Sequence, residues 1–492
     1  MNPLKKLLGQ TAVYGLSSIV GRTLNYLLVP LYTSIFSQHP EEYGIISQLY
    51  AFVAFLMVLL TFGMETTFFR FLQESDDKKQ VFQNSFLTVI LLNLVFFLGV
   101  YFFNTSIADA LLFSEHPEYI VLMGAIVAID ATSSLPLAKL RAEEKAMKFA
   151  VIQFSSIGVN IVLNLFFLLV LVDPNEPTNG VFLILIANLI SSLVKPLFLR
   201  ADFLLIRWKF DFAMLKKMLV YAIPIVIAGF AGIVNEVIDR IMLKQLLSEA
   251  TNPQSIKFAD AQIGIYSACY KLAMLVTILL QAYRYAAEPF FFNQMKNVER
   301  NKLYVKLMNY FTAAVCLVFL GVTLNLSIFK YFISSEIYWE GLKIVPILLL
   351  GNVFLGIYYN QSIWYKLTNQ TKYGAYISLL GALLTIGINY LFIPKYGYVA
   401  SAWATMIVYA FQMVLSYLWG QKHYPIKYNV RKFFLYVGAA LCLFWISTLL
   451  EFESAIVNFF LKNSLILIFI GLILFMENIS IAQLLPSKKK GS

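Results

Sequence analysis

Several charged residues lie inside long apolar segments of this chain, and their side chains could bind ligands or ions there. Arg22 and Lys271 are cations placed deep in two such segments, and Glu65, Asp130 and Asp239 are acids in three others. A charge at the centre of a bilayer costs about 3 kcal/mol on insertion scales, so each one requires a partner or a hydrated cavity. Arg22 and Lys271 are therefore predicted to line a hydrated cavity, and Glu65, Asp130 and Asp239 are candidate coupling or gating acids.

Other polar residues extend this predicted binding site. Arg22 shares one helical face with Asn25, so both are expected to contact the same ligand. Arg70 and Arg284 lie near the ends of their apolar segments, where they either assist binding or only extend their charges to the membrane interface. The predicted substrate-binding residues are Arg22, Asn25, Arg70, Lys271 and Arg284.

One segment carries several charges at helical spacing. Glu236 and Arg240 are four residues apart, so they can form an ion pair along one helix. If they pair, Asp239 is the acid of this segment that stays available for coupling or gating.

About fourteen apolar segments position these side chains, and each is near the ~20 residues that cross a bilayer as a helix. They are 10–36, 44–69, 82–103, 119–138, 149–172, 180–199, 218–243, 261–283, 307–326, 344–363, 373–392, 397–419, 433–450 and 463–483. Of the 38 Lys and Arg residues, 29 fall in alternate gaps that begin with the N-terminal tail, and 6 fall in the other gaps. By the positive-inside rule, both termini are predicted to be cytoplasmic.

The composition excludes several classes of protein. With 60% hydrophobic and 13% charged residues, the chain is not a soluble globular protein, in which the charged share is ~25%. The net charge of +11 is spread over the gaps as a topology signal, so no nucleic-acid partner is expected. The three cysteines and three histidines form no metal-ligand cluster, and no Gly-rich phosphate loop or catalytic constellation is present. Neither an enzyme nor a cofactor is expected.

The chain also shows a trace of internal duplication. Residues 44–50 (GIISQLY) and 264–270 (GIYSACY) share the pattern G-I-x-S-x-x-Y at an offset of 220 residues. Such parallel repeats are common in transporters. We therefore predict an all-α polytopic membrane protein of two six-helix lobes and a C-terminal helix pair. The predicted divisions are an N-terminal lobe at 1–200, a cytoplasmic interfacial linker at 201–217, a C-terminal lobe at 218–420, and helices 13 and 14 with a basic tail at 421–492.

Loose motifs spread over nearly the whole chain give it a family resemblance. They are Gly21-Arg22, Asn25, Pro30-Leu31-Tyr32, Tyr43-Gly44, Glu65, Phe69-Arg70-Phe71, Leu140-Arg141-Ala142-Glu143, Tyr221, Pro224, Asp239-Arg240, Gly264-Ile265-Tyr266, Tyr270-Lys271, Pro289-Phe290 and Asn389-Tyr390-Leu391-Phe392-Ile393-Pro394-Lys395-Tyr396-Gly397. In their order and spacing they resemble the polysaccharide transporter, or O-antigen flippase, proteins. That family belongs to the superfamily of multidrug, oligosaccharidyl-lipid and polysaccharide exporters.

The resemblance implies two lobes around a central cavity that opens to alternate sides of the membrane. It implies a flippase for undecaprenyl-pyrophosphate-linked oligosaccharide in the bacterial inner membrane, acting in the synthesis of surface polysaccharides such as the O-antigen of lipopolysaccharide. With that substrate, Arg22 and Lys271 would hold the anionic pyrophosphate, because Arg and Lys in a cavity of low dielectric offset its desolvation. The implied partners are this lipid-linked oligosaccharide and membrane lipids, and a glycan polymerase or ligase is a candidate protein partner. Tyr358, Tyr359, Asn360 and Trp364 suit sugar hydroxyls and ring faces, although aromatic residues at this depth also form interfacial belts.

Two other functions remain open from the sequence. A multidrug exporter driven by Na⁺ or H⁺ would use Asp130 or Asp239 to bind a cation. A scaffold for a glycan-assembly complex would transport nothing, and its function would survive neutral substitutions of the cavity charges.

Overall fold

The computed structural model describes residues 26–173, 176–204, 208–293, 299–368, 370–450 and 452–478, and these residues are all helix, turn or coil. Contacts along the chain divide it into two compact units. Unit 1 comprises residues 1–271, 333–341 and 375–405, and unit 2 comprises residues 272–332, 342–374 and 406–492. The predicted lobes are defined by chain order and by the repeat instead, and their boundaries stay a prediction.

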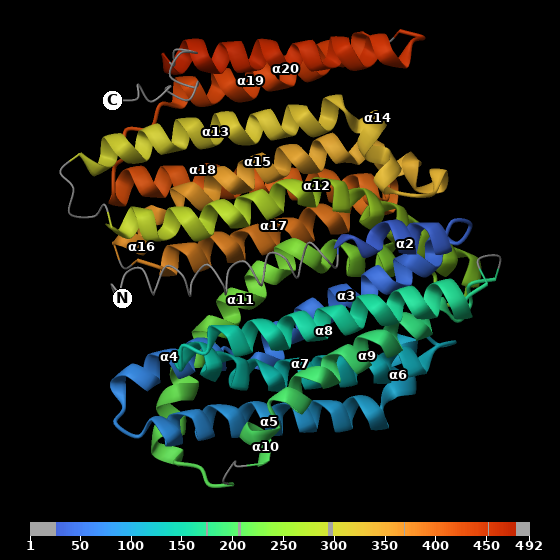
Figure 1. Cartoon of the computed structure of the whole chain (residues 1–492), viewed down its shortest axis with the longest axis vertical. Helices are drawn as coiled ribbons and strands as arrows, with labels where there is room; N and C mark the ends of the chain where they lie inside the picture. The colour runs from blue at the N-terminus through green and yellow to red at the C-terminus, as the bar shows by residue number, and fades with distance from the viewer. Residues whose placement is uncertain are drawn as a thin grey trace, which may run out of the picture. The chain divides into compact units, whose positions relative to one another are not determined.

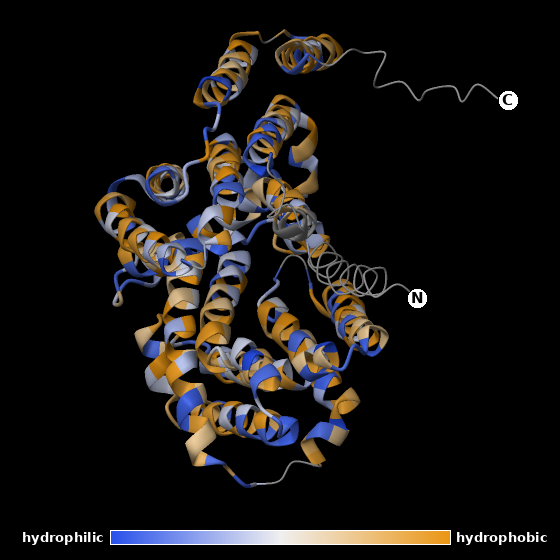
Figure 2. Cartoon of the chain, turned by 90° about the vertical axis from the view of Figure 1, so that its left-hand side faces the viewer, coloured by the Kyte–Doolittle hydropathy of each residue, from blue (hydrophilic) through white to orange (hydrophobic). Residues whose placement is uncertain are grey.

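Within the described residues, thirteen helices are long and apolar enough to cross a membrane. Each overlaps one of the predicted spans from 44–69 to 463–483, which confirms a multi-pass all-α protein. The first predicted span, 10–36, lies mostly outside the described residues, so the total of fourteen and the location of the termini stay predictions. Hydrophobic residues occur on helices throughout the chain, mixed with hydrophilic ones (Figure 2).

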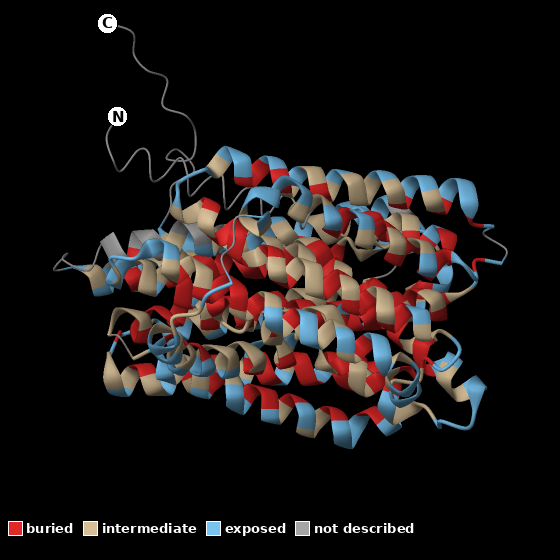
Figure 3. Ribbon diagram, turned by 90° about the horizontal axis from the view of Figure 1, so that it is seen from below, coloured by how far each residue is buried: buried red, intermediate tan, exposed pale blue. Residues whose placement is uncertain are grey.

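Unit 1 is a group of closely packed helices in which α7 lies between α5 and α9, α8 packs on α9, and α3 packs on α11 (Figure 1). Its helices are α2 (Leu28–Ile35), α3 (Pro40–Thr61), α4 (Met64–Glu74), α5 (Lys78–Phe102), α6 (Asn104–Ala110), α7 (Pro117–Ala142), α8 (Ala146–Phe166) with the π-helical turn η1 (Phe167–Leu171), α9 (Gly180–Phe198), α10 (Arg200–Leu204) and α11 (Phe212–Leu247). Buried, intermediate and exposed residues are interspersed along the helices of the chain (Figure 3).

Unit 2 is built around α13, which packs against α15, α19 and α20. Its helices are α13 (Arg300–Leu324), α14 (Leu326–Phe329) with η3 (Lys330–Phe332), α15 (Val345–Gln361), α16 (Ile363–Leu367), α19 (Val430–Leu449) and α20 (Ala455–Glu477). Lys432 and Tyr436 on α19 both donate to Glu477 Oε1 on α20, at 2.8 and 2.6 Å, and this joins the C-terminal pair at one end. The remaining elements contain residues of both units: α12 (Pro253–Asn293), η4 (Glu336–Ile344), α17 (Lys372–Tyr396) and α18 (Tyr398–His423).

The second membrane span is broken at a glycine. Helix α3 ends at Thr61 and α4 begins at Met64, and Gly63 between them has a φ of +60°. A Cβ atom at Gly63 would lie 3.2 Å from the carbonyl oxygen of Ala222 on α11, so both the backbone conformation and the close packing favour glycine. The break redirects the chain two residues before Glu65 and so places this acid on a separate short helix.

We expect Gly63→Ala to lower the free energy of unfolding by about 1 to 2 kcal/mol, because a side chain in the left-handed region is strained. Thermal unfolding of the purified protein in detergent measures the effect. Gly99→Ala on α5 is the matched control, since a Cβ there would meet no atom within 4 Å. A Gly63→Ala protein as stable as the Gly99→Ala protein would contradict this reading of the break.

Candidate functional site

The structure describes some of the predicted site residues and not others. Arg22 and Asn25 lie outside the described residues, so their predicted role stays a prediction. Arg70, Lys271 and Arg284 are described, as are the three acids that the sequence assigned to coupling or gating.

Two of these acids are neutralised by cations of unit 1. Lys195 on α9 donates to Asp130 Oδ1 on α7 at 2.8 Å, and both side chains are mostly buried. Glu65 on α4 accepts a hydrogen bond from Arg141 at the end of α7. In this conformation each carboxylate joins two helices of unit 1 through an ion pair.

Arg70 lies on the exposed side of α4. Its Nε donates to Glu74 at 3.0 Å, and its guanidinium lies 4.2 Å from the centre of the Tyr221 ring. The Arg70 side chain is about half exposed, so it would contact a ligand at the surface of unit 1.

The third acid, Asp239, is buried and fully engaged. Its Oδ1 accepts from Arg240 Nη1 at 2.9 Å, and its Oδ2 accepts from the Tyr266 hydroxyl of α12 at 2.5 Å. Arg240 also donates to the backbone carbonyl of Glu236 at 3.1 Å. The guanidinium therefore pairs with Asp239 and not with the Glu236 side chain, which corrects the predicted i,i+4 pair. Spacing within one helix could not show this, because Tyr266 of another helix orients Asp239.

Arg240 also contacts aromatic rings of α12. Its guanidinium lies 5.3 Å from the ring centre of Tyr266 and 4.6 Å from that of Tyr270. Stacking on two rings together with an ion pair holds the group in one orientation. Arg240 is thus a fixed positive charge whose own counter-ion is already present.

Lys271 and Glu236 differ from the paired charges around them. Lys271 is half-buried on α12, and Glu236 is exposed on α11. In the described part of the chain, neither side chain has an ion-pair partner within 4.0 Å. The charges that act on Lys271 through space are Arg240 and Glu236. Because an unpaired charge within a spanning helix requires water or a ligand, this face of unit 1 is the leading candidate site.

A second buried ion pair was missed by the sequence reasoning. Lys244 Nζ on α11 lies 2.8 and 2.7 Å from the two carboxylate oxygens of Asp260 on α12, and the ring centre of Phe113 is 4.2 Å away. The sequence placed these residues in a gap between spans. However, α11 is 36 residues long and α12 begins at Pro253, so both charges lie on helices.

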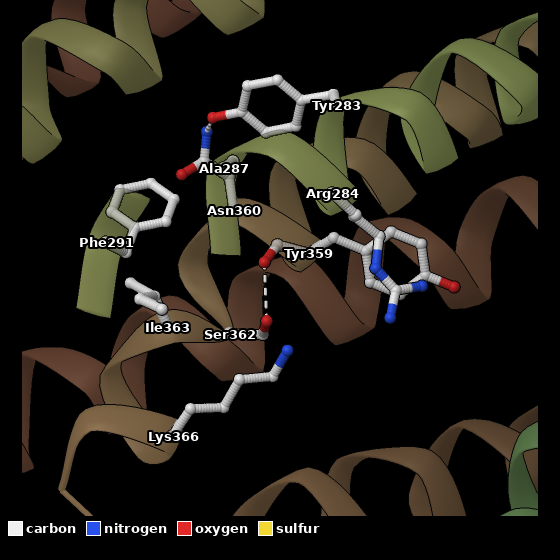
Figure 4. Close-up of a pocket in the computed structure, with 9 residues that line it drawn as sticks. All are labelled: Tyr283, Arg284, Ala287, Phe291, Tyr359, Asn360, Ser362, Ile363 and Lys366. Atoms are coloured by element: carbon white, nitrogen blue, oxygen red, sulfur yellow. Dashed lines mark hydrogen bonds between the residues drawn. The ribbon is translucent and has the colours of Figure 1, made fainter. Parts of the chain in front are cut away.

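Unit 2 has a small pocket of mixed polar and apolar lining next to Arg284 (Figure 4). Arg284 lies 4.3 Å from the ring centre of Tyr359, and Asn360 donates to the Tyr283 hydroxyl at 2.9 Å. The pocket is lined by Tyr283, Arg284, Ala287, Phe291, Tyr359, Asn360, Ser362, Ile363 and Lys366. It brings two cations together with the aromatic and amide groups that the sequence proposed for sugars.

The pocket has a volume of about 20 Å³. A cavity needs roughly 10 to 15 Å³ by this measure to hold one water molecule, so the pocket in this conformation has room for a water and not for a sugar ring. Its chemistry suits the edge of an anionic ligand, because Arg and Lys bind phosphate and a stacked guanidinium is already oriented.

Solved structures with the same fold are membrane transporters. "Lipid II flippase MurJ, inward closed conformation" aligns with a TM-score of 0.68 at 15% identity, over 93% of this chain and 98% of that chain. An outward-facing multidrug resistance MATE family transporter of the MOP superfamily aligns with a TM-score of 0.59 at 15% identity, over 84% of this chain and 94% of that chain. At this identity the likeness shows the fold alone. Comparison with curated proteins finds no match.

The sequence itself gives the family. A family model described as "Polysaccharide biosynthesis protein" matches residues 7–295, which is more than half of the 492 residues. This range contains the paired and unpaired charges of α11 and α12 described above. The chain therefore belongs to the polysaccharide biosynthesis protein family.

Proposed function

We propose that the chain is a flippase that moves undecaprenyl-pyrophosphate-linked oligosaccharide across the bacterial inner membrane by alternating access. The family supports a role in polysaccharide synthesis, and the fold is that of membrane transporters. The choice of substrate is our inference from the charges.

The observation that carries the proposal is the unpaired cation Lys271. A pyrophosphate is anionic at neutral pH and cannot cross hydrocarbon without compensation of its charge. Lys271 offers that compensation inside a spanning helix, whereas the charge of Arg240 is already balanced by Asp239. On α11, Asp239 is paired with Arg240, and Glu236 is the acid that acts on Lys271 through space.

The pocket of unit 2 supports the same substrate class. Arg284 and Lys366 supply positive charge, and Tyr359 and Asn360 supply a ring face and an amide. By the predicted topology this pocket lies at the cytoplasmic ends of its helices, where a lipid-linked glycan is made available. We propose it as the place where the head group first binds.

A cation-coupled multidrug exporter is the second candidate, and Glu236 is the observation that favours it. An exposed, unpaired carboxylate on a spanning helix can bind a proton, a metal cation or a cationic drug. The acids that the sequence proposed for this role, Asp130 and Asp239, are already paired with Lys195 and Arg240.

Deletion of the gene separates the two functions. We expect lipid-linked glycan to accumulate on the cytoplasmic face of spheroplast membranes, where an added glycosidase cannot reach it, and the wild-type gene to restore access. Normal delivery to the outer face, in a strain with no second flippase, together with new drug sensitivity would instead establish the exporter.

A further inference from the structure

The two copies of the duplicated motif meet in unit 1. A Cβ atom built on Gly44 of α3 would lie 1.8 Å from the carbonyl oxygen of Asp260 on α12. A Cβ atom built on Gly264 of α12 would lie 2.0 Å from the carbonyl oxygen of Pro40 on α3. These distances are far below any real contact, so the two helices approach closely only because both positions are glycine.

The contact has the symmetry of the repeat. Gly44 and Gly264 are 220 residues apart, and so are Pro40 and Asp260. Gly44 faces the carbonyl group of Asp260, and Gly264 faces that of Pro40. The two contacts are therefore equivalent under the repeat. The crossing lies near the N-terminal ends of α3 and α12, which the distribution of basic residues predicts to be extracytoplasmic.

Ion pairs surround the crossing. Asp260 accepts from Lys244 of α11, and Lys257 of α12 lies 3.1 Å from Glu41 of α3. Both pairs join helices that meet at this end of unit 1. The Lys257–Glu41 pair joins α12 to α3 across the crossing, and because Lys257 is exposed, water can replace this pair when the two helices separate.

Two buried polar side chains lie one turn deeper. Gln48 follows Gly44 by four residues and Ser267 follows Gly264 by three, so each shares the face of its glycine. Gln48 is 0% exposed and Ser267 is 2% exposed. In the described part of the chain, neither the Gln48 amide nor the Ser267 hydroxyl has a hydrogen-bond partner. Buried polar groups without partners are rare in folded proteins.

The same face of α12 continues to the candidate site. Ser267 precedes Lys271 by four residues, so one helical turn, about 5.4 Å, separates the hydroxyl position from the deep cation. A sugar attached to a pyrophosphate at Lys271 would therefore reach the level of Gln48 and Ser267 on its way to the crossing.

We propose that the α3–α12 crossing at Gly44 and Gly264 closes the extracytoplasmic end of the pathway, and that Gln48 and Ser267 bind glycan hydroxyls once the crossing separates. The closure follows from the contact alone, whereas the glycan ligand rests on the proposed function. The Gln48 amide and the Ser267 hydroxyl would then form their hydrogen bonds, with the glycan, in the open state.

The native Cys269 reports on the closure. It is buried between Gly264 and Lys271, and its Sγ lies 3.3 Å from the Tyr338 carbonyl oxygen. In a chain with Cys316→Ala and Cys442→Ser, a membrane-impermeant maleimide added outside spheroplasts would react only with Cys269.

We expect Gly264→Ala to raise the labelling rate of Cys269 by at least about 10-fold, because an open state of at most ~10% would become the main state. Gly387→Ala is the matched control in unit 1, since a Cβ there meets no atom within 4 Å. An unchanged rate in Gly264→Ala at normal protein level, or an equal rise in Gly387→Ala, would overturn the closure.

A second measurement uses the chain in which Gly44 and Gly264 are both kept. It covers the case in which Gly264→Ala fails to fold. Cys269 should label faster in cells that make the lipid-linked glycan than in cells blocked at its first sugar-transfer step. Slow labelling in both cells would overturn opening by this substrate. Faster labelling in Gly264→Ala without dependence on the glycan would keep the closure and reject the proposed function, so the two failures are distinct.

Gln48→Leu tests the binding role. Removing two unpartnered buried polar atoms should leave the folded protein at least as abundant, and a purely structural residue would leave export unchanged. We expect export to fall about 5-fold, as for one lost hydrogen bond, with Cys269 labelling no faster than in the parent chain. Unchanged export would reject Gln48 as a ligand-binding residue.

Discussion

Replacing Lys271 with alanine is expected to reduce export of the lipid-linked glycan about 10- to 100-fold while the amount of protein in the membrane stays the same. A charge-assisted hydrogen bond contributes ~1.5 to 3 kcal/mol, and this contact would be made only with the bound ligand. The fold loses little, because Lys271 has no ion-pair partner among the described residues. Surface glycan measured by antibody and protein measured by immunoblot give the two quantities.

Two further variants sharpen this prediction. Lys271→Arg keeps the charge and should retain a large part of export, since guanidinium also binds phosphate. Lys145→Ala removes an exposed cation that pairs with Glu143, and export should be normal. Normal export by Lys271→Ala would remove Lys271 from the pathway, and equal loss in Lys271→Arg would show that its shape and not its charge is needed.

The second large effect is expected at the buried pair of α11 and α12. Lys244→Met leaves Asp260 buried and without its cation, which is expected to lower the free energy of unfolding by about 3 to 5 kcal/mol. The side chains are 1% and 5% exposed, so solvent compensates little for the lost partner. Thermal unfolding in detergent, followed by fluorescence, measures the loss.

Replacing both members of the pair tests the cause. Lys244→Met combined with Asp260→Leu should recover most of the stability, because no unpaired charge remains. Lys302→Ala breaks the exposed pair with Glu299 and should change stability by less than about 1 kcal/mol. If Lys244→Met were as stable as Lys302→Ala, the pair would not be a buried one in the folded protein.

The spans could be predicted from the sequence because a bilayer imposes one simple requirement on every helix. Thirteen predicted spans correspond to thirteen helices, since each needs about 20 apolar residues whatever its neighbours are. The broken span at Gly63 was not predicted, because a glycine in an apolar run does not reveal its backbone angle.

The charges were harder to assign than the helices. Lys271 was predicted as a deep cation, since its depth follows from its position in the span. The partner of Arg240 was predicted wrongly, because Tyr266 of another helix selects Asp239 over Glu236. The pair of Lys244 and Asp260 was missed for a related reason, since ion pairs between helices depend on packing that spacing along one helix does not contain.

The crossing of Gly44 and Gly264 has a consequence for the origin of the chain. In a dimer with two-fold symmetry, a residue i that contacts residue j of the other subunit is matched by a second contact, between j of the first subunit and i of the second. Such a contact is called isologous. The reciprocal approach of Gly44 to Asp260 and of Gly264 to Pro40 has this form. A half-length ancestor with one copy of the motif could thus have paired with itself through the same glycine. Gene fusion would then have preserved an interface that already existed between two subunits.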